Sequence, residues 1–272
     1  MSVIALNLPW DSQPQDAVEV DWGNPLARGL TALLVPTVSG QQLYNVVHGG
    51  QISATGTITR VVGPSGLGQR YGDASGTAYQ TYTFPAGYVE TVGSVFWKGQ
   101  RNAAGPAIFR DNQSATANTL VWENGAGAWN ARVDGNNIAS SEGSFPIDTD
   151  IDFLLTGDTA GSNFFVKGVR LDTLDTVPWN WRGSSLINWH QNTNNGNGVL
   201  ATDYLIALYN RRLSAQEARE LSANPWQLFA PRQIWIPATA AASFNPTLSL
   251  PTYVPGSLTS SAFRPRVTAT WS

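Results

Sequence analysis

Acidic residues at alternating positions are the first pattern in this chain that could do chemistry. Most glycosidases need two carboxylates that face the same glycosidic bond. Alternate residues of a strand share one face, so a run such as E-x-D-x-E would place such a pair. Glu90, Glu123 and Glu142 stand alone, whereas 148–152 (DTDID) has the right alternation but follows Pro146 and contains no glutamate. We interpret 148–152 as a solvated turn entering a strand and expect no enzyme, with glycan hydrolysis as the alternative.

A region rich in tryptophan and side-chain amides favours a different chemistry, which is sugar binding. Sugars place their apolar ring faces on aromatic side chains and exchange hydrogen bonds with planar amides. The region supplies both groups and runs into a polar stretch, 193–198 (TNNGNG). The predicted carbohydrate-binding residues are Trp179, Trp181, Trp189, His190, Gln191 and Asn192. The alternative is a polar loop whose tryptophans pack inward.

Metal and phosphate chemistry have weaker signals. The two histidines, His48 and His190, are too few for a histidine-rich metal site. The glycine-rich segment 63–68 (GPSGLG) lacks the Lys-Ser/Thr pair and the following helix of a phosphate-binding loop. We therefore predict a hairpin loop there and no cofactor.

Composition narrows the class of protein. Only 13% of the 272 residues are charged, about half of the usual ~25%. The formal charge of −3 provides no basic field for a phosphate backbone, so nucleic acid is not an expected partner. There is no cysteine, and neither a signal peptide nor a run long enough to span a membrane is visible. We expect synthesis and folding in a cytoplasm.

Strands must position most of these residues. Segments rich in β-formers recur at roughly ten-residue spacing and are separated by Asp-Asn, Asn-Gly and Asp-Gly turns. The clearest strands are 30–36, 78–84, 91–98 and a hairpin of 151–157 with 163–169. This pattern predicts an all-β fold, a jelly-roll β-sandwich with extended terminal arms.

One helix stands out near the end of this pattern. The apolar strand 204–209 is followed by Ser214 and Glu217, which form an S-x-x-E capping box. The helix should end near Asn224, because Pro225 prevents its continuation.

Two motifs in the same stretch carry a family resemblance. The segment 209–217 (YNRRLSAQE) resembles the closing "YNRxLSxxE" of LamG-type, concanavalin A-like lectin domains. The continuation 224–232 (NPWQLFAPR), the opening 22–30 (WGNPLARGL) and the ending 263–268 (FRPRVT) are similar to LamG-like structural proteins of tailed bacteriophages and prophages. The resemblance implies an N-terminal arm over 1–21, a concanavalin A-like sandwich over 22–229 and a proline-rich C-terminal arm over 230–272.

The resemblance also implies a function. We expect a non-enzymatic virion structural protein, either a head decoration protein or a tail or fibre component, made in the cytoplasm of a host bacterium. A receptor module that binds host surface glycans is the alternative. LamG domains often bind calcium at one rim, and Asp73 is the acid we would test for Ca²⁺.

The C-terminal arm combines prolines with large apolar residues, which a disordered linker would lack. These residues must be buried against the sandwich of the same chain or against a neighbouring subunit. We therefore expect a homo-oligomer or contacts with other virion proteins. The predicted assembly residues are Trp226, Phe229, Trp235, Phe244, Tyr253, Phe263 and Trp271.

Overall fold

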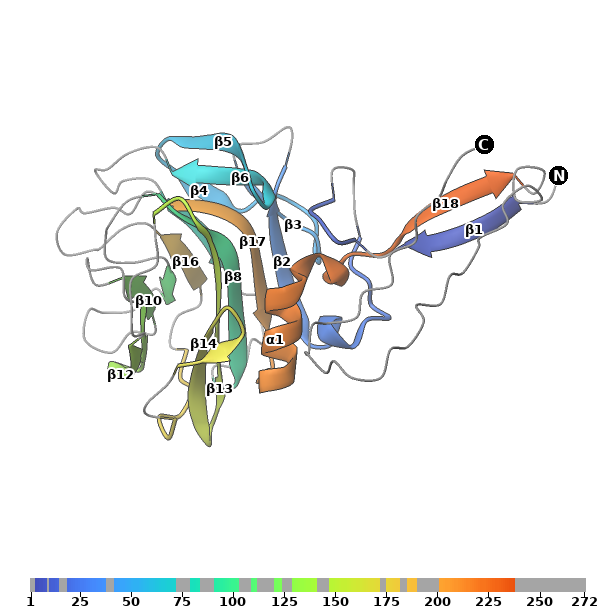
Figure 1. Ribbon diagram of the computed structural model, residues 1–272. Coiled ribbons are helices and arrows are strands. Elements are labelled where there is room, and N and C mark those ends of the chain that lie inside the picture. Colours follow the sequence, from blue (N-terminus) through green and yellow to red (C-terminus); the bar gives the residue numbers. More distant parts are fainter. Residues whose placement is uncertain are drawn as a thin grey trace, which may run out of the picture. The chain divides into compact units, whose positions relative to one another are not determined.

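The structure is a computed structural model of the chain (Figure 1). It describes residues 3–8, 10–14, 19–37, 42–71, 79–83, 91–102, 109–111, 120–123, 129–140, 147–171, 175–181, 185–189 and 201–237. The chain divides into two units, of which the larger is Pro9–Pro231 and the smaller joins Met1–Leu8 to Arg232–Ser272.

The larger unit contains two antiparallel sheets, which confirms the predicted all-β sandwich. The nine-stranded sheet has the order β15-β14-β13-β8-β17-β2-β3, and β6 pairs with both β17 and β5. Its strands are β15 (Val169–Arg170), β14 (Gly161–Val166), β13 (Asp150–Asp158), β8 (Gly93–Arg101), β17 (Ala201–Tyr209), β2 (Leu30–Pro36), β3 (Leu43–Asn45), β6 (Gly66–Tyr71) and β5 (Ile58–Gly63).

The second sheet of this unit has seven strands in the order β12-β11-β10-β9-β16-β7-β4. These are β12 (Asn136–Ser140), β11 (Trp129–Val133), β10 (Leu120–Glu123), β9 (Phe109–Asp111), β16 (Ser185–Trp189), β7 (Tyr79–Thr83) and β4 (Ser53–Thr55). The smaller unit holds an antiparallel pair, β1 (Val3–Leu8) and β18 (Arg232–Pro237).

The main core lies between the two large sheets. Val95 and Trp97 alternate with Phe96 along β8, so the first two contribute to this core and Phe96 to the opposite face. The Trp97 ring stacks on Phe153 at a centroid distance of 5.1 Å and approaches Trp129 at 6.2 Å. Buried aromatic rings from both sheets therefore join them.

A second apolar cluster covers the other face of the nine-stranded sheet, which we call the outer face. The helix α1 (Ala215–Ala223) and the 3-10 turns η1 (Pro25–Ala27) and η2 (Pro225–Leu228) contribute to it (Figure 1). The predicted capping box is confirmed, since Glu217 N donates to Ser214 Oγ at 3.2 Å and Ser214 N donates to Glu217 Oε2 at 2.8 Å. Within the described ranges α1 is the single α-helix, and no helix there is long and apolar enough to cross a membrane.

The glycine-rich segment 63–68 forms the turn of the β5–β6 hairpin, as predicted from its sequence. The domain limits 22–229 stay a prediction. Part of the expected N-terminal arm contacts the sandwich, because Trp10 Nε1 donates to the carbonyl oxygen of Ala230 at 2.9 Å and Val20 bridges Phe229.

Candidate functional site

Two of the predicted sugar-binding tryptophans lie in the core. Trp179 is 1% exposed and Trp181 is 0% exposed. Their rings stack on each other with centroids 5.9 Å apart. Neither ring offers an open face to a sugar, so these tryptophans pack inward, which is the alternative that the sequence left open.

The remaining predicted ligand residues stay predictions. Trp189 ends β16 opposite Tyr79, and its side chain lies outside the described residues, as do His190, Gln191 and Asn192. Asp73, the residue chosen for Ca²⁺, is also outside them. Among the described residues no group of three or more His, Cys, Asp or Glu could hold a metal ion.

The two predicted assembly aromatics that are described pack within their own chain. Trp226 is 4% exposed and Phe229 is 1% exposed, and their rings stack 6.3 Å apart in the outer-face cluster. Their prediction as subunit contacts is therefore wrong, because the turn after α1 folds them onto the sheet. Trp235 lies in β18 with no described side chain, and Phe244, Tyr253, Phe263 and Trp271 are outside the described residues.

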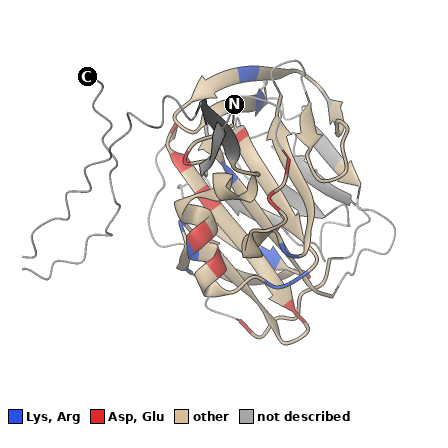
Figure 2. Cartoon of the chain, turned by 90° about the vertical axis from the view of Figure 1, so that its right-hand side faces the viewer, with Lys and Arg blue, Asp and Glu red and all other residues tan. Residues whose placement is uncertain are grey.

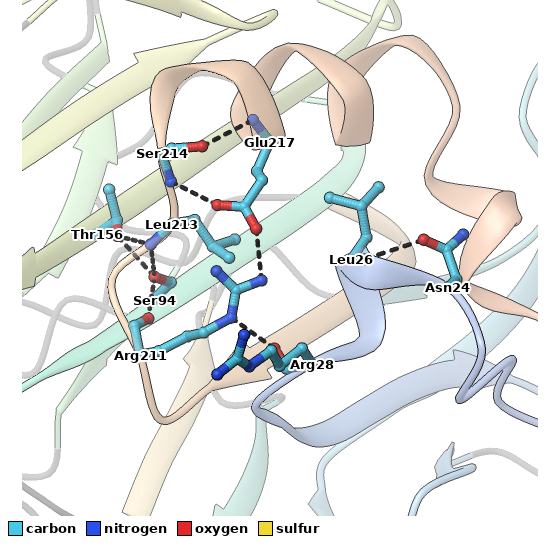
Figure 3. A network of polar contacts seen from close by, with 9 residues as sticks. All are labelled: Asn24, Leu26, Arg28, Ser94, Thr156, Arg211, Leu213, Ser214 and Glu217. Carbon is cyan, nitrogen blue, oxygen red and sulfur yellow. Dashed lines mark hydrogen bonds and ion pairs between the residues drawn. The ribbon is translucent and has the colours of Figure 1, made fainter.

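The closing segment 209–217 forms a structural junction, which we call the closing junction (Figure 3). Arg211 donates from Nη2 to Glu217 Oε1 at 2.6 Å and from Nε to the carbonyl oxygen of Arg28 at 2.6 Å. Leu213, 2% exposed, donates from its backbone N to Thr156 Oγ1 at 2.8 Å. These polar groups are satisfied by the chain itself, so they tie β17 to α1 and to the start of β2.

The alternating acids of 148–152 lie on the outer face in three different settings. Asp148 is exposed, with 67% of its side chain accessible, and has φ of 59°. Asp150 Oδ1 accepts from Gln100 Nε2 at 2.8 Å. Asp152 is 5% exposed, and burial raises its pKa against the opposing effects of the Ser222 hydrogen bond and of Lys98 and Lys167. The expected solvated turn therefore holds for Asp148 and is wrong for Asp152, which α1 helps to cover.

Asp150 belongs to a polar row that crosses the outer face at the end of the sheet away from the closing junction. The strand register pairs Asp150 with Gln100, Gln100 with Thr202, and Thr202 with Arg70. Residues directly opposite each other in a ladder share a face, so β13, β8, β17 and β6 each add one polar residue.

Two residues of this row, Arg70 and Gln100, line a hollow of about 360 Å³, which we call the outer groove. Asn102 Nδ2 donates to Asp148 Oδ1 at 2.6 Å, and Thr202 Oγ1 donates to Asn102 Oδ1 at 2.7 Å. Arg70 Nη2 lies 3.9 Å from Asp148 Oδ1, which leaves guanidinium hydrogens for a further acceptor. The lining residues are Val62, Gly63, Pro64, Arg70, Gln100, Asn102 and Asp148.

The β5–β6 turn forms a fixed wall of the outer groove. Ser65 Oγ donates to Asp150 Oδ2, and Gln13 Nε2 donates to the carbonyl oxygen of Leu67 at 2.9 Å. A Cβ atom on Gly63 would lie 1.9 Å from Tyr204 Oη, so glycine permits the close approach of the turn to β17. The groove is therefore pre-organised by bonds on both sides.

Comparison with known proteins identifies the architecture. No family model and no curated protein matches the chain. Several solved structures are similar to the chain. A sialidase from Trypanosoma rangeli in complex with sialic acid is 14% identical with a TM-score of 0.57, covering 72% of this chain and 33% of that chain. The chain thus spans about a third of the sialidase's length.

Two other solved structures are also similar. Domain 4 of AbnA, an extracellular arabinanase from Geobacillus stearothermophilus, in complex with arabinotriose, is 14% identical with a TM-score of 0.52, covering 71% of this chain and 98% of that chain. The binding domain of botulinum neurotoxin serotype D/C is 10% identical with a TM-score of 0.54, covering 72% and 52%. At these identities the likeness establishes the β-sandwich fold alone.

Proposed function

We propose that this chain is a non-enzymatic, lectin-like protein that binds carbohydrate in the outer groove. The observation that carries the proposal is the set of planar polar groups, Arg70, Gln100, Asn102 and Asp148, held in place by neighbours on four strands. A carboxylate accepts from sugar hydroxyls, whereas amide and guanidinium groups donate to them. Val62 and Pro64 add apolar surface for the C–H face of a sugar ring.

The similar structures support the ligand class. The sialidase holds sialic acid and the arabinanase domain holds arabinotriose. Fold similarity does not transfer a site, so the residues proposed for this chain come from its own groove.

The state of the carboxylates supports a binding role over hydrolysis. Glycosidases that use two carboxylates hold them roughly 5–10 Å apart on either side of the scissile bond. In the described part of the outer groove Asp148 faces the hollow, whereas Asp150 bonds Gln100 and Ser65. A second acid free to act as nucleophile or proton donor is missing from this lining.

For the setting, we propose that the sandwich is displayed on the particle of a tailed bacteriophage, as decoration protein or tail component. The phage-like motifs support this, and the fold joins two of them, because Asn24 Nδ2 of the opening motif donates to the carbonyl oxygen of Gln227 in the motif 224–232 at 2.8 Å. The separate unit of β1 and β18 would anchor the chain to particle subunits or to further copies.

The test of the binding site is a titration of host surface polysaccharide fragments into purified variants. Asn102→Ala should weaken binding about tenfold, because it removes hydrogen bonds worth roughly 1.5 kcal/mol in total. Asn136→Ala, an exposed asparagine on β12, is the matched control and should bind like wild type. If Trp189→Ala abolishes binding while Asn102→Ala leaves it unchanged, the site is the loop after β16 and not the outer groove.

The test of the setting is removal of residues 232–272. The sandwich should stay folded, because its described core lies within Pro9–Pro231, and the protein should be lost from purified particles. A truncated chain that still enters particles would contradict the anchoring role.

A further inference from the structure

A second hollow lies on the other side of the β5–β6 turn from the outer groove. Its volume is about 430 Å³, and both hollows share Gly63 and Pro64 in their lining. The phage-like motif 224–226 contributes to it, as does the N-terminal segment 11–13. The lining residues are Asp11, Ser12, Gln13, Gly63, Pro64, Ser65, Gly66, Lys98, Ala223, Asn224, Pro225 and Trp226.

Most polar side chains of this second hollow are already engaged. Gln13 exchanges hydrogen bonds with the backbone of Leu67, where Nε2 donates to the carbonyl oxygen at 2.9 Å. Asn224 Nδ2 donates to the carbonyl oxygen of Trp10 at 2.8 Å, and its Oδ1 accepts from Trp226 N at 3.1 Å. These bonds fix the wall and leave little capacity for a ligand.

Lys98 is the exception. It is the one cation among the residues that line the second hollow, and its ammonium has neither a hydrogen bond nor an ion pair with the described residues. The register places it opposite Asp152, whose charge interacts with it. That carboxyl, however, is buried and accepts from Ser222 beneath α1. The hydrogens of the Lys98 ammonium therefore remain available to a group in the hollow.

Asp11, the acid of the same lining, does not cancel this charge. It is exposed, and Ser12 Oγ lies 3.5 Å from its Oδ1. Water screens a charge at the rim more strongly than a charge on the strand below it. An anionic group that enters the hollow therefore meets Lys98 as its main charged partner.

The spacing of the floor residues suits a chain of sugar units. Lys98 and Gln100 are two residues apart on β8 and so lie on the same face, about 6.7 Å from each other. This is the length scale of one monosaccharide. Because the fixed turn at Pro64 lies between the two hollows, a saccharide that occupies both passes over this turn.

We infer that the outer groove and the second hollow bind one oligosaccharide, in which an anionic unit contacts Lys98 while another unit lies between Arg70 and Asp148. The inference rests on the proposed carbohydrate-binding function and specifies the ligand: Lys98 selects saccharides that carry a carboxylate or a phosphate. The two sources share one chemistry, an oxyanion within reach of an ammonium group.

The experiment is calorimetric titration of the full chain with paired oligosaccharides that differ only in one uronate, reduced to the neutral hexose in the second member. Wild type should prefer the uronate by about tenfold, the size of one charge-assisted hydrogen bond. Lys98→Gln should abolish this preference, and Lys98→Arg should retain most of it. A third saccharide, with a phosphate monoester in place of the uronate, distinguishes the two sources of the anion.

The chain offers a matched control, because its only other lysine is Lys167. Both lysines interact with Asp152, so Lys167→Gln changes the net charge and this environment in the same way but lies outside the second hollow. It should keep the full preference. A Lys98→Gln variant that also keeps it overturns the inference.

Failure of the inference differs from failure of the proposed function. Wild type that binds both saccharides equally overturns the role of Lys98 and leaves carbohydrate binding intact, whereas wild type that binds none of the three contradicts both. Methylation of the lysines with ¹³C preserves their charge and gives each one an NMR signal. The anionic saccharide should shift the Lys98 signal and leave that of Lys167 in place, and equal shifts of both would contradict the contact.

Discussion

The two ends of strand β17 lie in one sheet but differ in their surroundings, since one end leads into the covered closing junction and the other lies beside the outer groove. At the end of the strand, Tyr209 leads into the closing junction, where Leu213 is 2% exposed and Arg211 bonds Glu217 and Arg28. At its start, Thr202 donates a hydrogen bond to Asn102 of the outer groove, where the side chain of Asp148 is 67% exposed.

Coverage explains the difference. The helix α1 and the turn η2 bury the outer face at one end, where Arg211, Glu217 and the backbone N of Leu213 bond partners within the chain. At the other end the β5–β6 turn covers only part of the face, and the polar groups keep bonding capacity for a ligand. Charged residues are sparse on the described chain (Figure 2); Arg211 and Glu217 bond each other at the covered end, and Arg70 and Asp148 lie at the open end, where we propose that saccharide binds. We therefore expect substitutions at the closing junction to change the free energy of unfolding, and substitutions in the outer groove to change saccharide binding.

The largest expected effect is on stability, from Leu213→Ala in the closing junction. Removing a fully buried leucine side chain should lower the free energy of unfolding by about 2–5 kcal/mol. Urea denaturation followed by tryptophan fluorescence measures it. Val169→Ala, at a residue that is 60% exposed, is the control and should change little. A small loss at Leu213 would mean that the junction is not part of the core.

The next effect is that of the helix cap. Ser214→Ala leaves Glu217 N without its side-chain acceptor and should cost about 1 kcal/mol. Ser214→Asp restores an acceptor of comparable quality and should recover most of that loss. If both variants unfold at the same urea concentration, the cap does not contribute as the structure indicates.

Glu217 should make stability depend on pH. Burial alone would raise its pKa, but the hydrogen bond from Arg211, those from Ser214 and the charge of Arg211 outweigh burial, so the folded pKa is lowered. The stabilisation is therefore present above the unfolded value of about 4.3 and is lost as the pH falls through the folded pKa. The difference in unfolding free energy between wild type and Glu217→Gln should shrink below about pH 4.3. A difference that is constant with pH would contradict this account.

The smallest expected change in stability is in the outer groove. Asp148 has a positive φ that asparagine also tolerates, so Asp148→Asn should alter the free energy of unfolding by less than about 0.5 kcal/mol. The same change removes the carboxylate that faces the hollow and should weaken saccharide binding about tenfold. A variant that loses stability but binds normally would reverse the comparison between the two ends.

Local signals in the sequence predicted the closing junction well. The capping box of Ser214 and Glu217 and the stop at Pro225 act within a few residues, and the helix formed where they indicated. The glycine-rich turn at 63–68 was also predicted, although its role as a groove wall depends on the distant Asp150.

The outer groove was not predicted, because its residues meet only through strand register. Arg70 and Thr202 are 132 residues apart in sequence, and Gln100 and Asp150 are 50 apart. Trp179 and Trp181 were misleading for a different reason. The sequence does not distinguish a tryptophan that is exposed for sugar stacking from one that is buried in the core between two sheets. The alternating acids of 148–152 were the one available clue. They indicated that the acids share a face of a strand, but not which residues of the adjacent strands lie beside them.

The most direct test of the central claim is a crystal structure of the protein with a bound oligosaccharide from a host surface polysaccharide. We expect sugar density on the outer face, between Arg70 and Asp148 and beside Pro64. Sugar density on the seven-stranded sheet, or against Trp189 and the loop that follows it, with an empty outer groove would contradict the account.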